Sequence, residues 1–282
     1  MEKKILWGIT AILILVLWIK TNPFQDEDEK TKKETSSAQA EYDATEDEKS
    51  YFESHPIQTQ TPDFQEISDV KARKKAFFEY LSPFAKEKNA LILEDRKRLD
   101  ALMDKPEKLS TQDIEWISKL RKDNKLKVLE TYSRKDLQAL MLRLDIIPTS
   151  LVLAQAANES AWGTSRFATE GNNYFGQWCF RKGCGLVPES RSSGADHEVR
   201  KFHDARESVF AYIDNLNTNA AYKTLRQTRA DLRQRGKVVT GLALAQGLQH
   251  YSQRGQAYVQ EIISLINYNK LWRFNRVQAN NE

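Results

Sequence analysis

Helical periodicity is the feature that most limits how this chain can fold. Apolar residues recur at three- and four-residue intervals in VKARKKAFFEYLSPFAKEKNALILEDRKRLDALM, with lysines and glutamates between them. This spacing places one apolar stripe along a helix, and Pro83 is expected to kink or interrupt it. The periodicity returns after residue 204 and continues towards the C-terminus. We therefore expect a mostly helical chain whose 282 residues build one substantial core.

Two serines mark predicted helix starts. Ser110 is followed three residues later by Asp113, and Ser133 by Asp136. This is the spacing of a capping box, in which each side chain satisfies the other residue's free backbone N–H. Pro148 suits the first turn of a further helix. The chain is therefore expected to be helical from about residue 64 to about residue 170.

The periodicity stops between residues 171 and 202. Glycines, asparagines and serines dominate there, and GLVPESRSSGADHEVRKF predicts an irregular β-hairpin. Both cysteines of the chain, Cys179 and Cys184, lie in CFRKGC and could form a disulfide in an oxidising compartment. Free thiols are one alternative. The other is a metal site that recruits His197 and His203 as the two further ligands it would need.

The N-terminus carries a separate signal. Residues 5–19 (ILWGITAILILVLWI) are uncharged and almost wholly apolar, with Lys3 and Lys4 before them and Lys20 after. We expect residues 1–20 to be a signal anchor that tethers the protein to the inner membrane, with the rest of the chain on the periplasmic face. A cleaved signal peptide and a buried core helix are the alternatives.

Charge divides the remainder of the chain. Residues 21–65 hold twelve acidic and four basic residues and few aliphatic ones, so residues 21–63 are expected to form an acidic disordered linker. The rest is basic, which suits an anionic extracellular polymer. Nucleic acid is the less favoured partner, because the chain is expected to be exported and carries no recognised binding module.

One carboxylate stands out in LAQAANESAWGTSRFATEGNNYFG, residues 153–176. On a helix that starts at Pro148, Glu159 shares a face with Val152, Gln155 and Ala156 and has no basic residue within a turn. Such surroundings desolvate a carboxyl group and raise its pKa, which suits a general acid. A surface or helix-capping role is the alternative.

The same stretch resembles a known family. Its ES-x-WG motif followed by NNYFG is similar to the signature of the bacterial glucosaminidase domain, glycoside hydrolase family 73, and in particular to its Bax-type members; the resemblance runs from about residue 144 to 272. It implies a mostly α, α+β fold, with a lysozyme-like helical domain and a small β-hairpin lobe. It also implies endo-β-N-acetylglucosaminidase activity on peptidoglycan glycan strands, with Glu159 as the catalytic acid. No cofactor is expected.

The resemblance also sets the expected domain limits. We predict extra helices in an N-terminal extension over residues 64–142, followed by the catalytic domain over residues 143–275. The extension could pack on the catalytic domain, occlude its cleft or bind a protein partner. A muramidase or lytic transglycosylase on the same scaffold is the alternative enzyme. A non-catalytic wall-binding module is the alternative from another class.

A second catalytic carboxylate is expected in the hairpin. Glu189 matches the family's hairpin glutamate best, Glu198 comes second and Asp196 third, and any of them could be an ordinary solvated charge. A short separation from the acid would imply a covalent retaining route, and a longer one an attacking water. In a third route the substrate's own acetamido group attacks.

Aromatic residues complete the predicted site. Tyr251 and Tyr258 in HYSQRGQAYVQEI resemble the family's C-terminal Y-A-T-D-P-x-Y element, although TDP is absent and the spacing is one residue longer. Tyr251 is the third catalytic candidate, since its hydroxyl could steady an oxocarbenium ion. Tyr258 is expected to border the cleft.

Further aromatic residues follow the acid directly. Trp178 is predicted to stack on a sugar ring, and Tyr174 and Phe175 are further substrate-binding candidates. Core packing is the alternative for Trp178 and Tyr174, and it is the favoured interpretation for Phe175 and Trp162.

Overall fold

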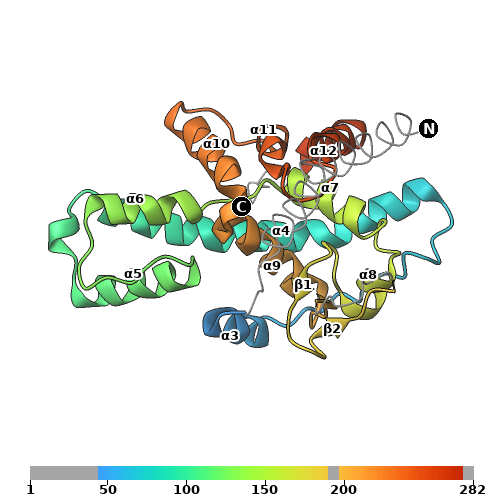
Figure 1. Ribbon diagram of the computed structural model, residues 1–282, viewed down its shortest axis with the longest axis horizontal. Coiled ribbons are helices and arrows are strands. Elements are labelled where there is room, and N and C mark those ends of the chain that lie inside the picture. Colours follow the sequence, from blue (N-terminus) through green and yellow to red (C-terminus); the bar gives the residue numbers. More distant parts are fainter. Residues whose placement is uncertain (1–43, 190–196, 276–282) are drawn as a thin grey trace, which may run out of the picture.

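Helices make up most of the computed structural model, which describes residues 44–189 and 197–275 (Figure 1). The apolar segment at residues 5–19, and Asp196, lie outside the described residues. In the part that is described, no helix is long and apolar enough to cross a membrane. The helices are α3 (Glu46–Ser54), α4 (Val70–Leu102), α5 (Thr111–Asp123), α6 (Arg134–Arg143), α7 (Thr149–Glu159), α8 (Arg166–Gly171), α9 (Ala205–Thr218), α10 (Lys223–Gln234), α11 (Gly241–Ala245) and α12 (Gln256–Tyr268).

Short 3-10 turns and strands connect these helices. The 3-10 turns are η1 (Pro106–Lys108), η2 (Ala220–Tyr222), η3 (Gln246–Leu248) and η4 (Leu271–Asn275). The strands are β1 (Trp178–Cys179), β2 (Gly185–Leu186) and β3 (Glu198–Arg200). The mostly α, α+β fold predicted from the sequence is confirmed, and so are the capping boxes at Ser110 and Ser133.

Helix α4 is the longest element and runs along the molecule (Figure 1). It continues through Pro83, so the predicted interruption does not occur. Proline removes one backbone hydrogen bond from a helix, but Leu81 and Ala85 on either side are fully buried and hold this turn in place. Helices α5 and α6 lie beside the far end of α4, away from α7 and α12.

The predicted extension and the predicted catalytic domain share one hydrophobic core. Phe77 and Leu81 from α4 belong to the same buried cluster as Leu151 of α7, Val209 of α9 and Ile262 of α12. The extension is therefore not a separate lobe, and α4 is a structural part of the unit that carries the site.

The prediction of a disordered linker over residues 21–63 is wrong for its C-terminal part. Residues 46–54 form helix α3, with a capping box between Thr45 and Glu48. The rings of Tyr51 and Phe52 lie 6.5 and 5.2 Å from that of Phe210. Acidic composition disfavours an isolated core, but these few contacts with a preformed surface are enough to order a short helix.

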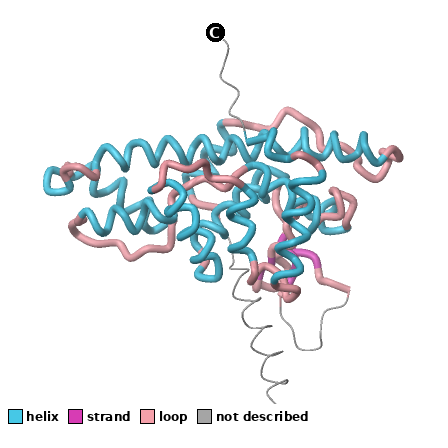
Figure 2. Tube along the Cα trace, turned by 90° about the horizontal axis from the view of Figure 1, so that it is seen from above, coloured by secondary structure: helices cyan, strands magenta, loops and turns pink. Residues whose placement is uncertain are grey.

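The strands form one small antiparallel sheet in the order β1-β3-β2. Figure 2 shows them gathered in one region, in magenta, among the helices. Strands β2 and β3 form the predicted hairpin, and β1 adds a strand that the sequence did not indicate. Gly185 is required in β2, because a Cβ there would collide with the backbone carbonyl of Val199.

Candidate active site

Glu159 is the last residue of helix α7. The helix is buried from Thr149 to Ala157, and only its last two residues, Asn158 and Glu159, are partly exposed. Alanines and leucines favour this helix and let it pass through the core. Glu159 therefore emerges where the helix leaves the apolar interior.

A chain of buried side chains holds the Glu159 carboxylate. Tyr258 Oη in the first turn of α12 donates to Glu159 Oε1 at 2.7 Å. Gln155 Nε2 donates to Tyr258 Oη at 2.8 Å, and Tyr212 Oη donates to Gln155 Oε1. Because the tyrosine oxygen accepts from Gln155, its own proton points at Glu159. The site thus presents one fixed carboxylate oxygen and leaves Oε2 for other chemistry.

The surroundings of Glu159 raise its pKa. Burial is the main cause; the hydrogen bonds from Tyr258 and Asn158 and the charge of Arg254 oppose it, and the charge of Glu261 adds to it. Desolvation penalises the charged carboxylate more than these partners favour it. Glu159 consequently holds its proton at higher pH than an exposed glutamate does.

Tyr251 supports Tyr258 and has a different hydrogen-bond partner. Its ring stacks on that of Tyr258 with centroids 5.5 Å apart and planes at 6°. Its hydroxyl donates to the backbone carbonyl of Phe175 at 2.9 Å. Sequence analysis predicted a catalytic role for Tyr251 and a position at the border of the cleft for Tyr258. In the structure it is Tyr258 that contacts the Glu159 carboxylate.

Comparison with known proteins identifies the family of this chain. Residues 134–271 match the glucosaminidase family described as mannosyl-glycoprotein endo-beta-N-acetylglucosaminidase. The chain is also 33% identical over 214 residues to "Protein bax" of Escherichia coli (strain K12), an alignment that covers 74% of each protein. The chain belongs to the Bax-type glucosaminidase family. No solved structure matches it significantly.

Membership of this family indicates that the protein is a glycosidase. Glu159, Gln155, Tyr212, Tyr251 and Tyr258 all lie within the matched residues. Sequence analysis noted Gln155 only as a neighbour on the helix face and missed Tyr212, Arg254 and Glu261. Tyr212 and Glu261 could not be linked to the acid from the sequence, because they come from α9 and from the second turn of α12, far from Glu159 along the chain.

Tyr174 and Phe175 lie in the core of this fold, so core packing, and not direct substrate binding, describes both rings. Both are buried; Phe175 stacks on Tyr212 with centroids 4.0 Å apart, and Tyr174 lies 6.2 Å from Phe77. The reason is the turn made by Asn173, whose Nδ2 donates to the backbone carbonyls of Gln177 and Arg200. This turn directs the two rings inward.

Trp178 remains a candidate for sugar stacking. It lies half-buried in β1, and its ring stacks on the imidazole of His197 with centroids 4.0 Å apart and planes at 17°. One face of the indole is therefore covered by His197.

The candidates for a second carboxylate differ sharply in their surroundings. Glu189 has a side chain that is 90% exposed, 4.0 Å from Arg166 Nε. Glu198 is buried, and its two oxygens accept from the backbone N–H groups of Gly183 and Gly185 at 2.9 and 2.8 Å. Glu198 therefore holds the loop between β1 and β2, which is a structural position.

That loop is also closed covalently. Cys179 and Cys184 form a disulfide, with Cα atoms 6.2 Å apart. The two sulfurs and a Glu198 oxygen lie close together, but sulfurs bonded to each other are not the thiolates that bind metal ions. The disulfide prediction is confirmed, and the free-thiol and metal alternatives do not hold in this oxidised state.

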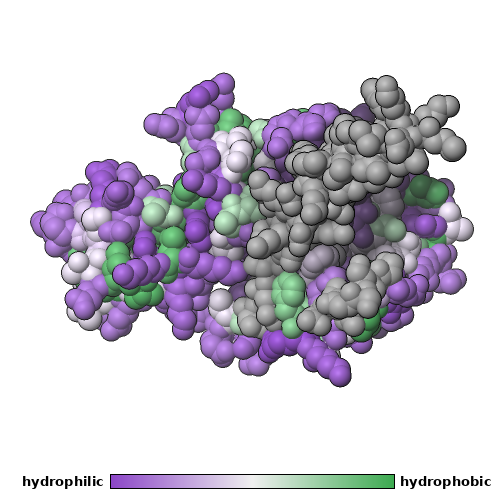
Figure 3. Space-filling model, in the orientation of Figure 1, coloured by the Kyte–Doolittle hydropathy of each residue, from purple (hydrophilic) through white to green (hydrophobic). Residues whose placement is uncertain are grey.

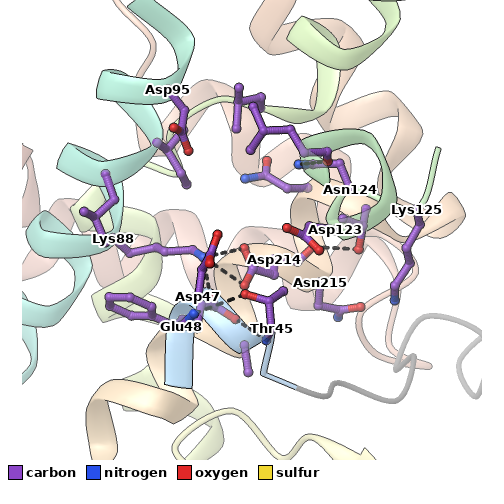
Figure 4. Close-up of a pocket in the computed structure, with 18 of the residues that line it drawn as sticks. Thr45, Asp47, Glu48, Lys88, Asp95, Asp123, Asn124, Lys125, Asp214 and Asn215 are labelled. Carbon is purple, nitrogen blue, oxygen red and sulfur yellow. Dashed lines mark hydrogen bonds and ion pairs between the residues drawn. The ribbon is translucent and has the colours of Figure 1, made fainter. Parts of the chain in front are cut away.

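A separate cavity of about 290 Å³ lies between the start of helix α3, helix α4, the end of α5 and helix α9, and Glu159 does not line it (Figure 4). Lys88 Nζ contacts Glu48 Oε1 at 2.6 Å and Asp214 Oδ1 at 2.9 Å there. Burial opposes the charged ammonium, but the two carboxylates outweigh it and raise the pKa of Lys88. Burial raises the pKa of Asp214 to about 8. This buried triad fastens α3 to α4 and α9.

Proposed function

We propose that this chain is a peptidoglycan hydrolase, an endo-β-N-acetylglucosaminidase in which Glu159 is the general acid. The observation that carries the proposal is the desolvated Glu159 carboxyl held by Tyr258 within the residues that match the glucosaminidase family. An acid with a raised pKa can carry a proton to the glycosidic oxygen near neutral pH. The basic character of the chain after residue 65 suits an anionic wall polymer.

Each partner of Glu159 has a distinct part in the proposed step. The protonated carboxyl gives its proton from Oε2 to the leaving-group oxygen. Tyr258 keeps its hydrogen bond to Oε1 while the negative charge develops, and hydrogen bonds to a carboxylate are stronger than those to a neutral acid. Gln155 keeps the tyrosine hydroxyl from turning away. The same contacts therefore orient the acid and stabilise its conjugate base.

The partner on the other face of the sugar is proposed to be Glu189. It is exposed in the hairpin, 4.0 Å from Arg166 Nε, so it can act as a base on water without first leaving a structural bond. A carboxylate distant enough to admit that water would give inversion. Attack by the substrate's own acetamido group is the alternative, and it needs no Glu189.

We further propose that the protein acts on the periplasmic face of the inner membrane, with residues 1–20 as its anchor. The disulfide between Cys179 and Cys184 supports export, because such bonds persist in oxidising compartments. The acidic linker predicted after residue 20 would then let the enzyme reach glycan strands away from the bilayer.

Digestion of purified sacculi tests the activity. Wild type, Glu159→Gln and the control Glu170→Gln are compared; Glu170 is exposed on α8, with Arg166 as its ion-pair partner. We expect wild type and the control to release fragments with N-acetylglucosamine reducing ends, and Glu159→Gln to bind sacculi without turnover. N-acetylmuramic or anhydromuramic ends would instead identify a muramidase or lytic transglycosylase. Equal products from Glu159→Gln would contradict the assigned acid, and binding without turnover by wild type would indicate a wall-binding module.

A further inference from the structure

The turn that follows the acid has an unusual backbone. Ala161, Trp162 and Gly163 all adopt positive φ, at 49°, 62° and 80°. Alanine and tryptophan rarely occupy this left-handed region, because the Cβ atom crowds the backbone. Successive residues of this kind persist only where surrounding contacts hold them.

Hydrogen bonds within the turn satisfy its backbone. Trp162 N donates to the carbonyl of Ala157 at 3.0 Å, which is the closing bond of a Schellman motif. Gly163 N donates to Ser160 Oγ at 2.9 Å, and Ser165 N donates to the carbonyl of Ser160 at 3.0 Å. These local bonds tie the turn to the end of α7, and none of them reaches another element of the fold.

Residues 64 and 65, which lie upstream of the matched family region, connect the turn to another part of the fold. The buried ring of Phe64 occupies the place where a side chain on Gly163 would lie. Gln65 Nε2 donates to the carbonyl of Thr164 at 2.9 Å. The segment thus contacts two consecutive residues of the turn, one through packing and one through a hydrogen bond.

The start of α4 holds the tryptophan of the turn. The rings of Phe77 and Phe78 meet Trp162 edge-on at 5.9 and 5.5 Å. Lys74 Nζ lies 4.5 Å from the centroid of the same indole. All of these residues precede residue 134, where the family match begins. An indole held on three sides cannot swing out without disturbing the backbone that follows Glu159.

We propose that residues 64–78 are a positioning element of the active site, which locks the turn at residues 160–164 and so fixes the Glu159 carboxyl against Tyr258. The glucosaminidase region at residues 134–271 is then catalytically incomplete without this segment. The inference rests on the proposed function for its kinetic consequences, although the placement of Glu159 can be measured without turnover.

Phe64 and Phe84 provide a matched pair of variants in the full chain. Both phenylalanines are buried, at 3% and 7% exposure, and both rings contact Tyr80. Only the Phe64 ring fills the space above Gly163. Phe64→Ala and Phe84→Ala should therefore lower the thermal midpoint to similar extents. Gln65→Ala removes the exposed hydrogen bond to Thr164 and should leave the fold intact.

The kinetic expectation separates positioning from stability. Phe64→Ala should lower kcat on peptidoglycan by about tenfold or more with little change in KM, because a displaced acid loses its alignment with the reacting bond. Gln65→Ala should lower kcat less but in the same direction, and Phe84→Ala should leave kcat unchanged at temperatures where it is folded. Equal loss of kcat in Phe64→Ala and Phe84→Ala, or none in Phe64→Ala, would overturn the proposal.

A titration gives a readout that needs no turnover. The carboxyl ¹³C signal of Glu159, assigned with Glu159→Gln, is followed against pH in each variant. Phe64→Ala should lower its midpoint by about half a pH unit, since a loosened turn admits water to the carboxyl, whereas Phe84→Ala should not. An unchanged midpoint in Phe64→Ala would refute the positioning role. A shifted midpoint in a protein that lacks turnover would refute the proposed activity and leave the positioning role standing.

Discussion

Tyr258 Oη donates a hydrogen bond to Glu159 Oε1 at 2.7 Å, joining residues that are 99 positions apart in the chain. The contact links the start of α12 to the end of α7. It is reinforced by Gln155, which is fully buried and donates to the same tyrosine oxygen. The acid therefore depends on the packing of two helices for its orientation as well as for its pKa.

Replacing Tyr258 with phenylalanine should move the pH profile upward. The tyrosine bond lowers the pKa of Glu159 against the opposing effect of burial, so its loss raises that pKa further. A general acid works while it is protonated, so the alkaline limb of kcat should move up by about one pH unit, given about 1.5 kcal/mol for a hydrogen bond to a charged group. The measurement is kcat on soluble glycan fragments between pH 4 and about 9.

Tyr251→Phe is the control for that measurement. It removes a hydroxyl whose partner is the Phe175 carbonyl and keeps the ring stacked on Tyr258. Its alkaline limb should stay close to that of wild type. If Tyr251→Phe moves the limb and Tyr258→Phe does not, the roles assigned to the two tyrosines are reversed.

The two hairpin glutamates should respond differently to substitution by glutamine. Glu198→Gln replaces one of two acceptors for backbone N–H groups, so it should reduce the free energy of unfolding by about 1–3 kcal/mol. Glu189 is exposed, so Glu189→Gln should leave stability unchanged and lower kcat by about tenfold or more if it activates water. Urea unfolding and kcat are measured on both variants. Full activity in Glu189→Gln would favour participation by the substrate's acetamido group.

The acid-bearing helix could be predicted from the sequence because its signals are local. The apolar run before Glu159 and the ES-x-WG motif lie within one helix and the turn that follows. The inward direction of Tyr174 and Phe175 could not be predicted, because it depends on Asn173 bonding to strand β3 across 27 residues. A run of aromatic residues looks the same whether it faces a ligand or the core.

Helix α3 shows a second limit of sequence reasoning. Its acidic residues indicated a linker, yet Glu48 is paired with a buried lysine 40 residues away. Only the fold places Lys88 and Phe210 where α3 can dock against them. Figure 3 shows that hydrophilic residues cover most of the described surface on one face, so surface composition does not mark such docking points.

Reduction of the disulfide should destabilise the sheet region. The bond closes a short loop between Cys179 and Cys184, and the chain-entropy treatment gives a contribution of about 2 kcal/mol for a loop of this length. Opening it also loosens Gly183, one of the two N–H donors to Glu198. Thermal unfolding with and without a phosphine reductant should show a lower midpoint when reduced. The Cys179→Ser, Cys184→Ser double variant should unfold at the midpoint of the reduced protein, and the reductant should not change that midpoint. If the reductant leaves the midpoint of wild type unchanged, the disulfide does not stabilise the protein.

Replacing Lys88 with methionine should lower the free energy of unfolding by an amount that depends on pH. The change leaves Glu48 and Asp214 facing each other without their counter-charge, and removing one partner of a buried ion pair costs about 3–5 kcal/mol. Burial already raises the pKa of Asp214 to about 8 with the lysine present. That part of the pH dependence is shared by wild type and Lys88→Met. In wild type, burial opposes the charged form of Glu48, but the charge and hydrogen bond of Lys88 outweigh it and lower the pKa of Glu48. Without the lysine, burial raises that pKa, and a carboxyl with a raised folded-state pKa destabilises the fold as pH rises above its unfolded value, so the loss relative to wild type should grow between about pH 4 and pH 8.

Urea unfolding at about pH 4 and about pH 8 tests this expectation. The proteins compared are wild type, Lys88→Met and the control Lys75→Met. Lys75 pairs with Glu79 at 3.9 Å on the exposed face of the same helix, with side chains 73% and 60% exposed. Its removal should change the free energy of unfolding by less than about 1 kcal/mol at either pH. Proteolysis within residues 44–63 should accelerate only in Lys88→Met, because the triad joins α3 to α4 and α9. If both variants lose equal stability, or if Lys88→Met loses none at the upper pH, the buried triad is not what holds α3 in place.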